Sequence, residues 1–338
     1  MKIIIGLLAV LLLFGCVGDE RESVLNETNE SEEPPPVTII VEEQQNQTTE
    51  GEALPGEPEE NETEISTDIT YEYNPDLPFG IFFIDIAGKT EHGNSILIKK
   101  GDLDILIDAG PEQNGNEVVD FLTSRSVDDI ELLISTNADP RNYGGIKEVT
   151  ENFEVEHFWW NGGTFADQEY ISLTNTIKES VKEHEIIEEG FSREYNGIQI
   201  EIIGPPTDRF DDINNDAIVT KVTNGNTSIL LLSGLQKGGV QKLASEKSNE
   251  IKSQIIQAPY YGLGEGTKDI TLFLLAAEPE VMIITGSADD SPANGGSREP
   301  YLRAMEQHGI SWNSTYDNGT LRITSDGSDY IIQNVSSN

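Results

Sequence analysis

Thirteen residues near the middle of the chain decide the fold, and they read Ile134-Ser135-Thr136-Asn137-Ala138-Asp139-Pro140-Arg141-Asn142-Tyr143-Gly144-Gly145-Ile146. The apolar run at residues 132–134 predicts a buried strand. This strand ends at a polar loop, and the glycine pair then leads into a helical pattern. Because α/β folds place functional residues in the loops that follow buried strands, we expect the site here.

The loop resembles the metal-binding loop of the metallo-β-lactamase superfamily, in the form found in the extracellular domain of ComEC-type competence proteins. The family pattern is Thr-His-x-Asp-x-Asp-His-x-Gly-Gly, and Thr136, Asp139 and the glycine pair match it. Asn137 and Asn142 stand at the two His positions, and Arg141 stands at the second Asp position. Zinc needs imidazole, thiolate or carboxylate donors, so we expect no dinuclear zinc site and no cofactor, with zinc as the alternative.

Three later stretches follow the family's order but also carry other residues at its ligand positions. Leu235 stands where the family has the Asp that bridges two metals, and an aliphatic side chain cannot ligate. Tyr260 and Tyr261 replace a His pair after a proline, where their rings can fill the volume of a metal. Glu299 takes the place of the His that precedes the last helix. The resemblance covers about residues 79–335.

The resemblance implies an α/β fold, the four-layer αββα sandwich, in which two mixed sheets pack face to face and helices cover both outer sides. The alternation of strand and helix patterns agrees with this fold class. The expected strands are residues 79–86, 95–98, 103–107, 130–134, 157–160, 186–187, 197–203, 217–222 and 228–232, and the expected helices are residues 116–126, 143–152 and 168–184.

Residues 1–16 have the layout of a secretory signal peptide, with Lys2 followed by an apolar run too short to span a bilayer comfortably. The run ends in Leu-Phe-Gly-Cys, which resembles a lipobox whose Cys16 is lipidated. Cys16 is the only cysteine, so no disulfide or thiol metal site accounts for it otherwise. We expect an exported lipoprotein held on the outer face of the cytoplasmic membrane, with an ordinary signal peptide or signal anchor as the alternative.

The formal net charge of −40 is not evenly distributed along the chain. Residues 17–76 contain 19 acidic residues against Arg21 alone, together with a triple proline and many polar residues. This composition predicts a disordered, self-repelling tether, followed by a metallo-β-lactamase-like domain at residues 77–338. The domain is acidic as well, which disfavours nucleic acid as a partner.

Eight Asn-x-Ser/Thr triplets fit an exported glycoprotein. Together with the lipobox and the acidity, they favour an archaeal cell-surface protein. The triplets begin at Asn26, Asn29, Asn46, Asn61, Asn226, Asn313, Asn318 and Asn334.

Two residues of the candidate site have alternative roles. Asp108 ends a buried strand, where family members use a carboxylate to brace the metal loop, but it can equally cap the following turn. Arg141, beside Asn137, Asn142 and Tyr260, can hold an anion in place of the metals, or it can pair with an aspartate and close the cavity. A single Mg²⁺ or Ca²⁺ has no compact carboxylate spacing to support it. The four histidines fall outside the matched positions, and we expect them at or near the surface.

The preferred interpretation is a metal-free, non-catalytic binding or scaffolding module, a pseudoenzyme that binds the membrane through Cys16 and an unknown surface partner or anionic ligand. Its candidate ligand pocket comprises Asn137, Asp139, Arg141, Asn142, Tyr260, Tyr261, Asp108 and Glu299. The alternatives are a metal-dependent hydrolase of the phosphodiesterase or nuclease kind with an unorthodox site, and a surface-structural protein without a ligand.

Overall fold

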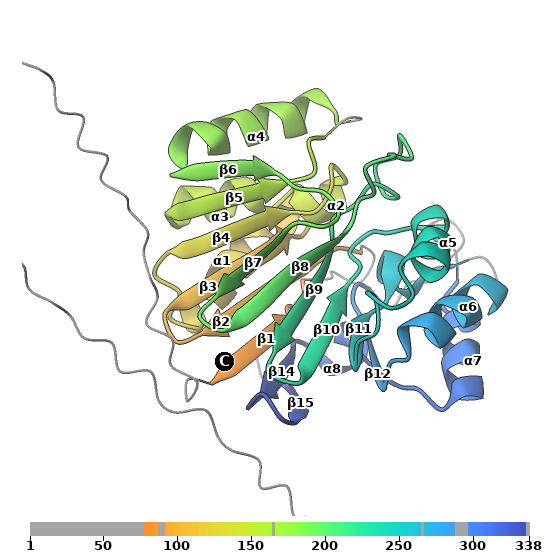
Figure 1. Ribbon diagram of the computed structural model, residues 1–338. Helices are drawn as coiled ribbons and strands as arrows, with labels where there is room; N and C mark the ends of the chain where they lie inside the picture. Colours follow the sequence, from red (N-terminus) through yellow and green to blue (C-terminus); the bar gives the residue numbers. More distant parts are fainter. Residues whose placement is uncertain (1–77, 87–91, 164–165, 265–266, 288–296, 336–338) are drawn as a thin grey trace, which may run out of the picture. The chain divides into compact units, whose positions relative to one another are not determined.

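A computed structural model of the chain describes residues 78–86, 92–163, 166–264, 267–287 and 297–335 (Figure 1). The predicted signal peptide, the acidic tether and Cys16 therefore lie outside the described residues, as do the first four Asn-x-Ser/Thr triplets. Among the helices of the described residues, none combines the length and the apolar character needed to cross a bilayer.

Two mixed β-sheets form the centre of the domain. The eight strands of the first sheet are, in spatial order, β15 (Tyr330–Asn334), β14 (Leu321–Ser325), β1 (Phe79–Phe83), β2 (Ser95–Lys100), β3 (Leu103–Ala109), β4 (Ile130–Ser135), β5 (Val155–Trp160) and β6 (Glu183–Ile186). The seven of the second are β13 (Ser311–Ser314), β12 (Val281–Ile284), β11 (Ile255–Gln257), β10 (Thr227–Leu231), β9 (Val219–Asn224), β8 (Ile198–Gly204) and β7 (Ser192–Tyr195). In each sheet, one run of four neighbouring strands is parallel: β3 to β6 in the first sheet and β10 to β13 in the second.

Helices cover the outer faces of both sheets. The helical segments that follow the strands of the first sheet are η1 (Glu112–Asn114), α1 (Gly115–Ser124), α2 (Pro140–Tyr143), α3 (Ile146–Asn152) and α4 (Gln168–Ser180). Those of the second half are α5 (Lys237–Glu246), η2 (Pro259–Gly262), α6 (Thr267–Ala277), α7 (Glu299–His308) and α8 (Thr315–Asn318). Figure 1 shows α1, α3 and α4 beside the first sheet and α5, α6 and α7 beside the second.

Three apolar clusters hold these four layers together. The first lies between the sheets and draws on both, for example Ile105 and Leu132 from the first and Ile229 from the second. The second lies between the first sheet and its helices, and the third between the second sheet and α5, α6 and α7. Strands buried on both faces are mostly apolar, as in the run at residues 132–134. The predicted αββα sandwich is confirmed.

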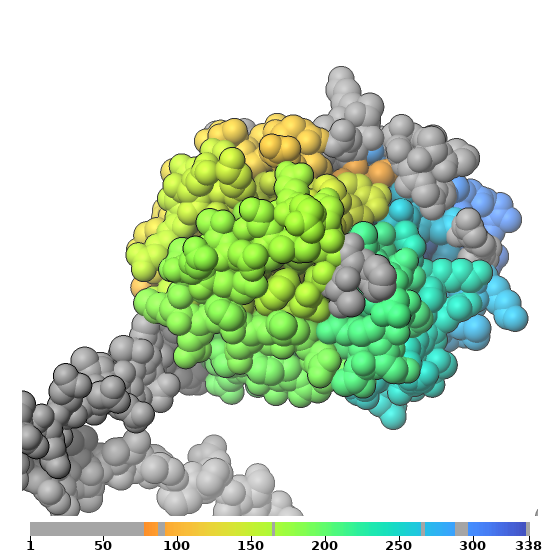
Figure 2. Space-filling model, turned by 90° about the horizontal axis from the view of Figure 1, so that it is seen from above, coloured from red at the N-terminus to blue at the C-terminus, as the bar shows by residue number. Residues whose placement is uncertain are grey.

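Figure 2 shows the domain from above, with the yellow-green atoms of β5 to α4 on one side and the cyan and blue atoms of α5 to α7 on the other. The chain thus divides into two halves, each made of one sheet with its own helices, apart from β14 and β15, which return to the first sheet.

Some predicted boundaries are wrong. The helix expected to run to residue 184 ends at Ser180, and Glu183–Ile186 instead forms β6, which pairs parallel with β5. Here the backbone pairing at the sheet edge outweighs a sequence with little apolar character. The helix expected at residues 143–152 is two helices, α2 and α3, separated at Gly144 and Gly145. The strand β7 was not predicted at all.

Candidate functional site

The site lies where the carboxyl ends of parallel strands from both sheets meet. Asp108 closes β3, Thr136 follows β4, Ser233 follows β10, Gln257 ends β11 and Thr285 follows β12. All five side chains are buried. Because parallel strands present their carboxyl ends at one edge, the fold itself gathers polar groups there that are far apart in the sequence.

Asp108 joins the two sheets. One carboxylate oxygen accepts from the Thr136 backbone N–H at 2.8 Å, and the other accepts from the Thr136 hydroxyl at 2.6 Å and the Ser233 hydroxyl at 3.2 Å. Burial raises the pKa of Asp108 to about 7, and these three donors only partly oppose the shift. Asp108 thus braces the loop that follows β4, which is one of the two roles expected from the sequence.

Neutral amides and hydroxyls fill the space beside Asp108. The Asn142 amide nitrogen donates to Asn137 at 2.8 Å and to Ser233 at 3.2 Å, and the Asn142 oxygen accepts from Asn94 at 3.2 Å. The Asn94 oxygen in turn accepts from Gln257 at 2.8 Å and from Thr285 at 2.6 Å. We call this group the strand-end network; it comprises Asn94, Asp108, Thr136, Asn137, Asn142, Ser233, Gln257, Tyr261 and Thr285.

Arg141 is held by the aspartate two residues before it. Its Nε donates to Asp139 Oδ1 at 2.9 Å, and its Nη2 donates to Asp139 Oδ2 at 2.5 Å. Asp139 also caps α2 by accepting from the Arg141 backbone N–H at 3.0 Å. The guanidinium lies 5.2 Å from the ring centroid of Tyr260 and 5.1 Å from that of Tyr261. The positive charge at this position is therefore balanced within the loop and packed on aromatic rings.

Tyr260 and Tyr261 occupy left-handed backbone conformations, with φ values of 47° and 59°. Tyr261 is fully buried, and its hydroxyl donates to the Asn142 oxygen at 3.0 Å. His92 stacks on the Tyr261 ring, with centroids 5.4 Å apart. The Tyr260 hydroxyl lies 3.5 Å from Arg141 Nη2. Such conformations are costly for residues other than glycine, so the surrounding contacts must hold them in place.

The glycine pair of the loop is required by close packing. A Cβ at Gly144 would lie 2.4 Å from the Glu112 nitrogen, and one at Gly145 would lie 2.2 Å from the Ala109 oxygen. Any side chain at either position would push the loop away from the end of β3, on which Asp108 lies.

Two of the candidate residues lie away from the network. Glu299 is 60% exposed at the start of α7 and pairs with Arg303 one turn further on. Leu235 is buried in the apolar cluster under α5, where its side chain packs against Gly239. The structure brings together the other candidates: Asp108, Asn137, Asp139, Arg141, Asn142, Tyr260 and Tyr261.

The donors in the network do not fit the metals of the resembled family. The two carboxylates nearest the loop are Asp108, which accepts three hydrogen bonds, and Asp139, which is neutralised by Arg141. Among the described residues, no three His, Cys, Asp or Glu side chains are grouped so that they could hold a metal ion. Amide oxygens are weak neutral ligands, and a guanidinium beside the site repels a cation.

Sequence reasoning missed several members of the network. Asn94, Ser233, Gln257 and Thr285 were not singled out, although three of them lie at or just after the end of an apolar strand. That position is a usable signal for a site residue. The expectation of surface histidines is wrong for His92, which is only 2% exposed and lies against Tyr261.

Comparison with known proteins gives relatives by sequence. No family model matches the chain. The chain is 22% identical over 205 residues to ComE operon protein 3 of Bacillus subtilis, covering 61% of this chain and 26% of the relative. It is 23% identical over 235 residues to competence protein ComA of Neisseria gonorrhoeae, covering 68% of this chain and 30% of the relative. The chain thus spans less than a third of the length of either curated relative.

Solved structures with similar coordinates include the metallo-β-lactamase fold protein YhfI from Bacillus subtilis, with a TM-score of 0.49 and 10% identity over 74% of this chain and 100% of that chain. Another is the metallo hydrolase Igni18 from the archaeon Ignicoccus hospitalis, with a TM-score of 0.46 and 10% identity over 72% of this chain and 98% of that chain. The described domain is an αββα sandwich of the metallo-β-lactamase type, and its sequence is similar to ComEC-type competence proteins.

Proposed function

We propose that this chain is a lipid-anchored protein on the outer face of the cytoplasmic membrane, in which a ComEC-like metallo-β-lactamase domain has lost its metals and serves as a non-catalytic binding or scaffolding module. One of its two relatives is named a competence protein, and the comparison covers less than a third of the length of either relative. The proposal therefore concerns the domain alone and does not extend the activity of the larger proteins to this chain.

The observation that carries this proposal is the strand-end network. Asn137 and Asn142, at the two matched His positions, are hydrogen-bonded to each other, and Arg141 forms a short ion pair with Asp139. A metal would have to displace bonds that already satisfy these buried groups, and buried polar groups are costly to leave unpaired. Neutral amides joined in this way stabilise the edge of the sandwich without any metal.

Metal content tests the proposal. The full-length chain, purified in detergent without chelator and offered Zn²⁺, Mn²⁺ and Mg²⁺, should retain less than about 0.1 equivalents of any of them after gel filtration. One or two tightly held metals per chain, with phosphodiesterase activity lost in Asp139→Ala, would overturn the proposal and establish the alternative, a metal-dependent hydrolase. Asp120→Ala, which removes an exposed carboxylate on α1, is the matched control.

The membrane anchor has its own test. Cys16 follows an apolar run in a lipobox-like context, and a diacylated cysteine holds a protein on a bilayer much more firmly than a single acyl chain does. The native chain should sediment with membranes and gain the mass of lipid at Cys16, whereas Cys16→Ser should be released into the soluble fraction. Equal membrane association of both chains would contradict lipid anchoring.

The acidic surface limits the kind of partner that the chain can bind. The net charge of −40 disfavours nucleic acid as a ligand of the chain as a whole. We therefore propose a protein or small-molecule partner at the cell surface.

A further inference from the structure

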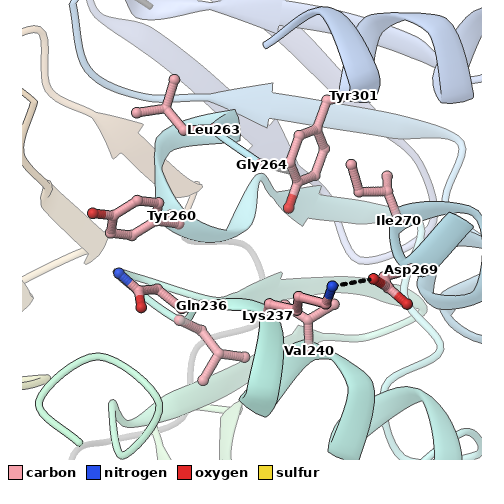
Figure 3. Close-up of a pocket in the computed structure, with 10 residues that line it drawn as sticks. Gln236, Lys237, Val240, Tyr260, Leu263, Gly264, Asp269, Ile270 and Tyr301 are labelled. Atoms are coloured by element: carbon pink, nitrogen blue, oxygen red, sulfur yellow. Dashed lines mark ion pairs between the residues drawn. The ribbon is translucent and has the colours of Figure 1, made fainter. Parts of the chain in front are cut away.

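A pocket of about 300 Å³ opens beside the strand-end network, on the far side of Tyr260 (Figure 3). It lies between the start of α5, the segment after η2, the first turn of α6, and α7. This volume is at the lower end of the range for small-molecule sites. Its lining residues are Leu235, Gln236, Lys237, Val240, Tyr260, Leu263, Gly264, Asp269, Ile270 and Tyr301.

Tyr301 provides a polar group that opens into the pocket. Its side chain is only 4% exposed and lines the pocket, and its hydroxyl forms no hydrogen bond with another of the described residues. Burial alone raises the pKa of this phenol, with no hydrogen bond contributing to the shift. Figure 3 shows the hydroxyl directed into the pocket, toward the side where Lys237 lies. The hydroxyl is therefore available to donate to, or accept from, a molecule that enters the pocket.

Two opposite charges stand at the same pocket. Lys237, the first residue of α5, pairs with Asp269 of α6 at 3.0 Å, as the dashed line in Figure 3 shows. Asp269 also accepts from Gln241 at 2.9 Å. The Lys237 side chain is 58% exposed, so the pair contributes little to stability and a ligand can replace it at small cost. The pocket as a whole carries no net charge.

Aliphatic side chains form much of the remaining lining, which we call the aliphatic wall. It comprises Leu235, Val240, Leu263 and Ile270, and all four side chains are buried. A ligand that contacts this wall gains hydrophobic free energy, while its polar end can reach the charged pair.

We propose that this pocket binds a small zwitterion with an aliphatic side chain, an apolar α-amino acid. Its carboxylate accepts from the Lys237 ammonium and the Tyr301 hydroxyl, its ammonium donates to Asp269, and its side chain lies against the aliphatic wall. The inference rests on the proposed binding role of the domain, for which it names the class of ligand.

The charge balance favours a zwitterion over an anion or a cation. A net charge on the ligand would leave either Lys237 or Asp269 without its counter-charge, and the carboxylate of Asp269, which is only 25% exposed, is the costlier of the two to leave unpaired. A simple anion would in addition approach a strongly acidic protein. A zwitterion provides a counter-charge for both Lys237 and Asp269 and leaves the net charge of the pocket unchanged.

Calorimetry with three probes of equal skeleton tests this. The full-length chain in detergent is titrated with L-leucine, with isocaproate, which lacks the ammonium, and with isoamylamine, which lacks the carboxylate. L-leucine should bind at least about 10-fold more tightly than either analogue, because each lost charged hydrogen bond costs about that factor. Absence of heat with L-leucine, or equal affinity for all three probes, overturns the inference.

Matched variants locate the site. Tyr301→Phe should weaken L-leucine binding by about 10-fold without lowering the melting temperature, because the hydroxyl has no partner to lose in the free protein. Asp269→Asn should lower the preference for L-leucine over isocaproate. Tyr330→Phe removes a hydroxyl that donates to Glu280 on the surface and should leave binding unchanged. Unaltered binding in both Tyr301→Phe and Asp269→Asn overturns the assignment.

The metal-free proposal and the amino-acid site can be refuted independently of each other. A chain that holds metal and also binds L-leucine at this pocket would refute the metal-free proposal alone. A chain that holds no metal and ignores L-leucine would refute the amino-acid site alone.

Discussion

The strand-end network and the adjoining pocket are neighbours through Tyr260, but they differ in how their polar groups are paired. In the strand-end network, Asn142 makes four hydrogen bonds and Asp108 accepts three. In the adjoining pocket, the hydroxyl of the largely buried Tyr301 opens into the cavity and has no hydrogen-bond partner among the described residues. The paired groups of the network stabilise one another, whereas the hydroxyl in the pocket remains available to a ligand.

The strand-end network holds the matched loop in place through hydrogen bonds between protein groups. Here Asn137, Asn142 and Ser233 supply neutral hydrogen bonds across this edge of the sandwich, and Asp108 links Thr136 of one half to Ser233 of the other. Losing an interaction in this network should therefore cost stability, whereas losing one in the pocket should cost binding.

The largest expected effect is that of Asp108→Ala. The change leaves the Thr136 backbone N–H and the Thr136 and Ser233 hydroxyls without their acceptor in a fully buried place. We expect the free energy of unfolding at pH 5 to fall by about 4 kcal/mol, measured by urea denaturation. Asp120→Ala, at an exposed position on α1, should change it by less than about 0.5 kcal/mol. Similar small losses for both variants would show that Asp108 does not join the sheets.

The next prediction concerns how the free energy of unfolding changes with pH. Because burial raises the pKa of Asp108 from 3.8 to about 7, the folded state binds a proton more tightly than the unfolded state does. The raised pKa therefore stabilises the folded state fully below about pH 4, and this stabilisation is lost as the pH rises through 7, by about 4 kcal/mol in total. Asp108→Asn, which keeps an acceptor for Thr136, should flatten the decline in unfolding free energy over this range.

A second buried carboxyl provides the control for this pH dependence. Glu131 lies on β4, accepts from the Asp104 backbone N–H at 2.7 Å, and has a pKa raised by burial to about 8. Glu131→Gln should remove the part of the decline that extends above pH 7, and Asp108→Asn should not. An unchanged pH profile in Asp108→Asn would contradict the assigned pKa of the network.

Asn142→Ala should have an intermediate effect. It removes the donor to Asn137 and Ser233 and leaves the Tyr261 hydroxyl without its acceptor. We expect a loss of about 2 kcal/mol in unfolding free energy, determined from chemical denaturation at pH 7. The exposed Asn152→Ala on α3, which loses a bond to the Glu148 oxygen, should cost less than about 0.5 kcal/mol. Equal costs at both asparagines would mean that the network contributes no more than an ordinary surface contact.

Much of this comparison could be predicted from the sequence, because it depends on residues at strand ends. The apolar run at residues 132–134 requires a strand buried on both faces, whereas the short helix α2 was not predicted. The replacement of histidines by Asn137 and Asn142 can be read from the sequence, and the absence of a dinuclear zinc site stays a prediction. The order of landmarks from Thr136 to Tyr260 was sufficient for the sandwich.

What the sequence could not provide is which distant groups meet. Asn94 reaches Gln257 across 163 positions, and nothing in either segment indicates the pairing. Glu299 matched a ligand position in the family but faces solvent, because the direction of a side chain at the start of a helix depends on how that helix packs. The unpartnered hydroxyl of Tyr301 is likewise a property of its surroundings and not of its residue type.

The smallest expected effect on stability is therefore the most informative about the pocket. Tyr301→Phe keeps the ring in the apolar cluster beneath α5, α6 and α7 and removes only the unpaired hydroxyl. Since no hydrogen bond is lost, the unfolding free energy without ligand should stay within about 0.5 kcal/mol of the native value or rise slightly. Tyr261→Phe offers the matched comparison, because its hydroxyl donates to Asn142 and its removal should cost about 1 kcal/mol. A larger loss for Tyr301→Phe than for Tyr261→Phe, measured by chemical denaturation, would place Tyr301 in a structural network and remove the distinction between the two regions.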